Sequence, residues 1–103
     1  MYMDTKELLT EIKARFNHNL AKDYLRDKQE SKLIFADQGG LWKATLELLT
    51  FLRTSNDNTV VLLDTYNNPL FINRKQILEK AENVYLSVMS DWANEWKELE
   101  RKR

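Results

Sequence analysis

The chain has 103 residues, enough for one domain with a single core, and we expect one domain over residues 1–103. Its 16 basic and 16 acidic residues cancel, which argues against nucleic acid or an anionic membrane as a partner. The absence of cysteine excludes a disulfide framework and thiolate zinc sites. Met1 to Lys13 lacks the apolar run of a signal peptide, and no stretch reaches the roughly twenty apolar residues of a membrane span. We therefore expect a soluble intracellular product, or one that leaves the cell inside a larger particle.

The first thirty residues predict a helix from about Thr5 to Glu30. Asp4 is a good N-cap, and Glu7 stands three residues later, as in a capping box. Apolar residues then recur mostly at steps of three and four, which indicates one buried stripe. They are Leu8, Leu9, Ile12, Phe16, Leu20 and Tyr24. The opposite side carries Lys, Arg, Glu and Asn and is interpreted as a solvated face.

The middle of the chain predicts a strand followed by a short helix. Residues 33–35 are rich in β-formers and precede a turn at residues 37–40. Residues 41–44 either extend beside that strand or lead into the next element, and both interpretations stay open. Thr45 can cap a helix whose apolar side is formed by Leu46, Leu49, Phe51 and Leu52.

Two apolar runs, residues 60–63 and 70–72, predict a β-hairpin. Asn67 and Asn68 favour a turn between them, and Pro69 restricts Asn68 to extended geometry, so we expect a turn longer than two residues. The continuous run at 60–63 predicts a strand covered on both faces.

The last thirty residues predict the longest helix, which starts at about Arg74. Asn73 is its N-cap, with Gln76 at the reciprocal position. One stripe is formed by Ile77, Ala81, Val84, Val88, Trp92, Trp96 and Leu99, flanked by Leu78, Tyr85 and Met89. Such a helix is about 45 Å long, which exceeds the width of a small domain. The fold class we expect is α+β, with a small antiparallel sheet of about three strands, two long helices and one short helix, in the order α-β-α-β-β-α.

No arrangement of residues predicts catalysis. His18 is the only histidine, and spacing alone gives it no partner. Asp37, Asp57 and Asp64 lie at loops or strand ends, but the Glu-x-Lys spacing of metal-dependent nucleases occurs only on or beside helices. We therefore expect no enzyme, no cofactor, no metal site and no small-molecule substrate. An acid–base pair assembled by folding, with His18 beside Asp37 or Asp64, would restore the enzyme hypothesis.

The far part of the last helix predicts a protein interface. Exposed tryptophan with aliphatic neighbours is a common anchor of binding surfaces. The candidate protein-binding residues are Tyr85, Met89, Trp92, Trp96 and Leu99. The alternative is that the first helix covers them in an antiparallel pair, and both possibilities stay open. For an interface, we expect Trp96→Ala to weaken association more than it lowers the melting temperature.

Several segments resemble small uncharacterised virion proteins of T-even-like, contractile-tailed phages of cyanobacteria. The segments are Asp37-Gln38-Gly39-Gly40-Leu41-Trp42, Asp64-Thr65-Tyr66-Asn67-Asn68-Pro69 and Trp92-Ala93-Asn94-Glu95-Trp96-Lys97-Glu98-Leu99-Glu100, with Ala14-Arg15-Phe16-Asn17-His18-Asn19 in the first helix. A looser likeness connects the strand, turn and long helix to an uncharacterised domain of phage tail-fibre and tail-fibre-assembly proteins.

The resemblance implies a structural or adaptor component of the tail, neck, baseplate or capsid. Its location would be the virion, after assembly in the host cytoplasm, and its partners would be other virion proteins or copies of itself, with no nucleic acid and no membrane. The resemblance brings no catalytic motif. The alternative function is a small soluble phage-encoded regulator or inhibitor that binds a host protein.

Overall fold

The two long helices begin at the residues that their caps predict. The computed structural model describes residues 4–102, and in it α1 spans Thr5–Lys32 and α3 spans Arg74–Arg101. Asp4 Oδ1 accepts the Glu7 N–H at 2.8 Å, and Asn73 Oδ1 accepts the Gln76 N–H at 3.0 Å. The N–H of Asn73 donates at 2.7 Å to Gln38 Oε1, a side chain from a distant turn, where a capping box would use Gln76.

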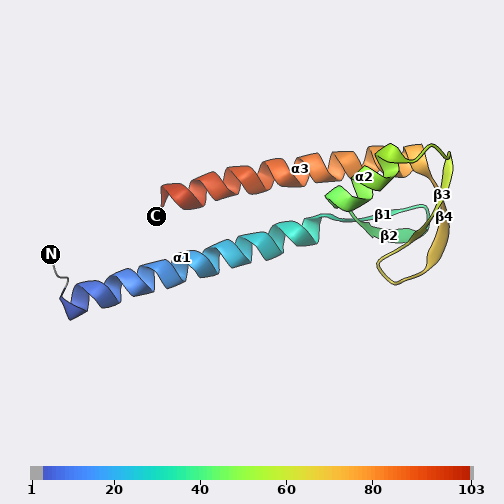
Figure 1. Ribbon diagram of the computed structural model, residues 1–103. Coiled ribbons are helices and arrows are strands. Elements are labelled where there is room, and N and C mark those ends of the chain that lie inside the picture. The colour runs from blue at the N-terminus through green and yellow to red at the C-terminus, as the bar shows by residue number, and fades with distance from the viewer. Residues whose placement is uncertain (1–3, 103) are drawn as a thin grey trace.

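Between the long helices lie two β-hairpins and one short helix (Figure 1). Strand β1 (Ile34–Asp37) pairs antiparallel with β2 (Gly40–Lys43), so residues 41–43 do extend beside the first strand. Gln38 and Gly39 connect them with φ of 49° and 81°, as a tight turn with positive φ at both central residues requires. Helix α2 (Leu46–Thr54) starts at the Thr45 cap, whose Oγ1 accepts the Leu48 N–H at 3.2 Å.

The second hairpin joins β3 (Thr59–Leu63) to β4 (Pro69–Asn73) through a turn longer than two residues, as expected. The Thr65 N–H at the start of this turn donates to Leu41 O at 2.8 Å and so links the two hairpins. The α+β class is confirmed. The observed order is α-β-β-α-β-β-α, and the strands form two separate two-stranded sheets where we expected one sheet of about three.

We call the two hairpins and α2 the head. The core lies where the head meets the first half of α3. Its buried apolar side chains come from every element of the head and from the α3 stripe. They include Trp42, Leu49, Leu52, Val60, Ile72, Ile77 and Ala81. Outside this core, most of α1 and the second half of α3 pack against each other, within residues 4–102.

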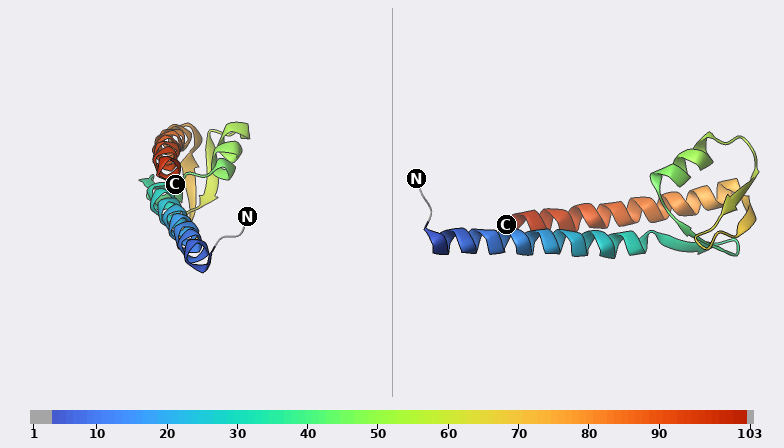
Figure 2. Two further views of the ribbon diagram at one scale, coloured as in Figure 1. Left: turned by 90° about the vertical axis from the view of Figure 1, so that its left-hand side faces the viewer. Right: turned by 60° about the horizontal axis from the view of Figure 1, so that its bottom comes forward.

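These parts of α1 and α3 run side by side as an antiparallel pair, which we call the stalk (Figure 1). The molecule measures 65 × 24 × 20 Å, so it is a rod and not a sphere. Figure 2 shows that α1 continues past the point where α3 ends. Of the helices in residues 4–102, none is both long and apolar enough to cross a membrane.

Candidate protein-binding surfaces

The apolar stripe expected to be buried on α1 is exposed. The exposed fractions of its six side chains range from 48% to 73%, and that of Phe16 is 62%. We call this set the outer stripe: Leu8, Leu9, Ile12, Phe16, Leu20 and Tyr24. The expectation of a buried stripe on α1 was therefore wrong, and the residues opposite it are those that meet α3.

The reason lies in a second, less apolar pattern on α1. Residues at alternating steps of four and three, beginning with Ala14, His18, Ala21 and Leu25, fall on one face in the spacing of a two-helix seam. Ala14 and His18 line a hollow of about 510 Å³ with Leu99, and Ala21 and Leu25 line a second one beside Leu99. This seam was the available sequence signal, and a search for large apolar residues misses it.

Polar contacts hold the seam in register. Lys28 Nζ and the buried Gln29 Nε2 both donate to Glu95 Oε1, at 3.0 and 3.1 Å. Farther along the stalk, the Lys22 ammonium lies 5.0 Å from the centre of the Trp96 ring, and the His18 ring centroid lies 6.5 Å from it. These contacts orient α1 so that the outer stripe points away from α3.

The candidate residues on α3 lie beside this seam. Tyr85, Trp92, Trp96 and Leu99 are half-buried, and Met89 is 37% exposed. Of the two possibilities left open, the structure contains the antiparallel pair, in which α1 covers part of Trp96. A role of these five residues in protein binding stays a prediction.

A second exposed apolar surface lies on the head, at the other end of the rod from the start of α1 (Figure 1). Val60 and Ile72 point into the core, whereas Val61, Leu63 and Phe71 point outward, with Phe71 81% exposed. We call these three outward residues the head face. The expectation that β3 is covered on both faces was wrong, because a two-stranded sheet packed on one side leaves the alternate residues open.

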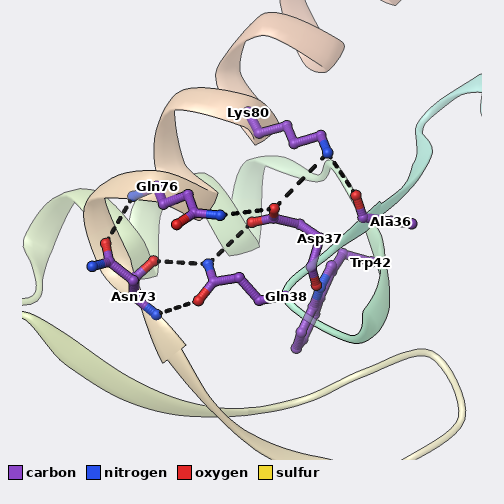
Figure 3. Close-up of polar contacts among 7 residues, drawn as sticks. All are labelled: Ala36, Asp37, Gln38, Trp42, Asn73, Gln76 and Lys80. Atoms are coloured by element: carbon purple, nitrogen blue, oxygen red, sulfur yellow. Dashed lines mark hydrogen bonds and ion pairs between the residues drawn. The ribbon is translucent and has the colours of Figure 1, made fainter.

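The head is fixed to α3 by a cluster around Asp37 (Figure 3). Its carboxylate accepts from Gln76 Nε2 at 3.2 Å and from Gln38 Nε2 at 3.1 Å, and Lys80 Nζ lies 3.9 Å from it. Lys80 also donates to Ala36 O at 2.7 Å. The Asp37 carboxylate therefore holds the turn between β1 and β2 against α3.

The Asp64 carboxylate also has a structural role, in the turn between β3 and β4. Its Oδ1 accepts the N–H groups of Asn68 and Tyr66, each at 2.9 Å, and these hydrogen bonds, chiefly that from Asn68, lower the pKa of Asp64. His18 lies in the stalk, 3.4 Å from Glu100, whereas Asp37 and Asp64 lie in the head. Folding thus does not bring His18 beside either aspartate. Within residues 4–102, no three His, Asp or Glu side chains gather closely enough to hold a metal ion.

No protein-family model, curated protein or solved structure matches the chain significantly.

Proposed function

We propose that this protein is a structural or adaptor component of a phage virion and that it binds neighbouring proteins through the outer stripe of α1. One observation carries the proposal: six large apolar side chains, regularly spaced over four turns of helix, face away from the protein's own core. Such contiguous apolar surface is characteristic of sites that another protein covers.

The shape of the molecule supports an adaptor role. The outer stripe belongs to the stalk and the head face to the opposite end of a 65 Å rod. Two apolar surfaces so far apart can contact two different neighbours at once, and repeated weak contacts add up in a symmetric particle. The resemblance to small virion proteins of contractile-tailed phages supports the same role.

The experiment compares two variants in purified particles of the virus that encodes the chain. Phe16→Glu places a charge in the outer stripe, and Leu86→Glu is its matched control, because both side chains are 62% exposed but Leu86 lies on α3, outside the stripe. Mass spectrometry should find the wild-type chain in particles at a fixed copy ratio to the other virion proteins. The Leu86→Glu variant should be found at the same ratio. Phe16→Glu should be missing from particles while its circular dichroism is unchanged.

A wild-type chain that is produced during infection but absent from particles would refute the proposal. That result would favour the alternative, a soluble regulator of a host protein. For the α3 residues, Trp96→Ala in the same assay separates a binding role from a packing role. A loss of thermal stability that equals or exceeds the loss of incorporation would mean that Trp96 serves the stalk.

A further inference from the structure

We propose that the outer stripe is covered by the outer stripe of a second copy of this chain, with the two α1 helices antiparallel. Because this pairing uses the surface to which the proposed function assigns binding, it rests on that function and names the partner. Three observations favour a second copy: the shape of the stripe, the charges beside it and the room around it.

The stripe has the form of a helix-pairing surface. Leu9, Ile12, Phe16 and Leu20 fall within about 80° of one another around α1, because each residue turns the helix by about 100°. Leu8 and Tyr24 border this group on either side. After Tyr24 the outward positions become Asp27 and Glu30, which are exposed and charged. The apolar segment is therefore short, with a defined end.

The charges beside the stripe are complementary between its two ends. Lys6 and Lys13 lie beside its N-terminal part, whereas Asp23 and Asp27 lie before and after Tyr24 at its C-terminal end. An antiparallel pairing in which Leu9 faces Leu20 of the second copy also places Lys6 across from Asp23, twice per dimer. A parallel pairing would instead set each charge against its own copy. Asp23 contacts Arg26 at 3.3 Å but keeps 62% of its side chain exposed, so it can accept a second partner.

The antiparallel register also leaves room for both heads. The overlap ends near Tyr24, and about eight further residues, or roughly 12 Å of helix, separate it from the end of α1 at Lys32. Each head therefore lies beyond the start of the other copy's α1. The six half-exposed side chains of each copy offer on the order of 500 Å² of accessible surface for burial. The dimer interface would therefore be at the small end of specific protein interfaces.

Sedimentation of the full chain is the first test. The wild type should dimerise reversibly, with a dissociation constant on the order of micromolar for an interface this small. Phe16→Glu should remain monomeric over the same concentrations with an unchanged helix content. Leu86→Glu should dimerise like the wild type. A wild type that stays monomeric at several hundred micromolar overturns the proposal.

Charge reversal tests the register. Lys6→Glu alone and Asp23→Lys alone should each weaken self-association about fivefold, because each reversal turns two attractive exposed pairs into repulsive ones. A mixture of the two variants should recover wild-type affinity, since both cross-pairs are then attractive. A mixture that associates no better than either variant alone excludes this register.

A distance measurement tests the orientation. Because the chain has no cysteine, Asp27→Cys places a single spin label on the outward side of α1. In the antiparallel dimer the two labels are separated by roughly 35 to 40 Å, whereas a parallel pair would bring them within roughly 15 Å. The short distance overturns the antiparallel arrangement.

Failure of the dimer and failure of the proposed function give different results. A monomeric wild type whose Phe16→Glu variant is still lost from particles means that another virion protein covers the stripe. A dimeric wild type that is absent from particles means that the dimer exists but the virion role does not.

Discussion

Asp64 directly follows β3, and its side chain organises the turn that leads to β4. The sequence places it in a loop, but the way its carboxylate gathers the N–H groups of Tyr66 and Asn68 appears only in the folded chain. Gly40 has an equally local role at the start of β2, where the Trp42 ring packs against the backbone. At both positions one residue fixes the geometry of a hairpin, and each leads to a measurable consequence.

For Asp64, we expect an acid-dependent loss of stability. Its pKa in the folded protein lies below the ordinary value of 3.8, so the unfolded chain binds more protons between these two values. The stabilisation is present above about pH 3.8 and is lost as the pH falls through the lowered pKa. Urea unfolding over a pH series should show a shallower acid decline for Asp64→Asn than for the wild type. Asp91→Asn, on the exposed side of α3, is the control, and an identical decline in all three proteins would contradict the prediction.

For Gly40, we expect steric destabilisation. A Cβ at this position would stand 2.6 Å from Trp42 Cζ2 and 2.9 Å from Leu70 Cδ1, both inside van der Waals distance. Gly40→Ala should lower the free energy of unfolding by about 1–3 kcal/mol, as overpacking does. The same substitution in a Trp42→Phe background should cost less, since phenylalanine lacks the clashing ring. Equal costs in the two backgrounds would place the strain elsewhere.

At the scale of elements, local signals predicted more than long-range ones. The caps Asp4, Thr45 and Asn73 and the hairpin of β3 and β4 followed from short stretches of sequence, because these features depend on neighbouring residues. The side of α1 that is buried did not follow from short stretches of sequence. Apolar spacing shows that a helix has a stripe, but it does not show whether the chain itself supplies the covering surface. The antiparallel pairing of α1 with α3 was one of two open alternatives, and in the structure the seam that includes His18 and Leu25 meets α3.

Two leucines on α1 test this facing directly. Leu20 is 51% exposed in the outer stripe, whereas Leu25 is 6% exposed in the seam with α3. Leu25→Ala should lower the free energy of unfolding by about 2–4 kcal/mol, and Leu20→Ala should change it by less than about 0.5 kcal/mol. Urea unfolding should be measured at submicromolar protein, where self-association is negligible. The reverse ranking would mean that α1 is rotated about its axis.

At the scale of the whole molecule, the confinement of the core to one end produces an extended particle. The Cα radius of gyration is 19.9 Å, whereas a spherical domain of this length would have about 13 Å. Under the proposed adaptor function, the head face and the outer stripe would therefore contact separate neighbours at the two ends of the long axis.

Small-angle X-ray scattering should reproduce this extension. The Phe16→Glu variant, held monomeric, should give a radius of gyration close to 20 Å, and wild-type values should rise further with concentration. A monomer near 13 Å would mean that the stalk folds back onto the head in solution.

The part of α1 beyond the end of α3 has a further consequence. Helical segments shorter than about 12–15 residues are marginal in water without tertiary support, and the first turns of α1 extend past the end of α3. This overhang should fray in the free protein and offer the peptide bond after Lys6 to trypsin, while a bound neighbour would shield that bond. The rate at which trypsin cleaves the start of α1 therefore reports whether the chain has been incorporated into a larger assembly.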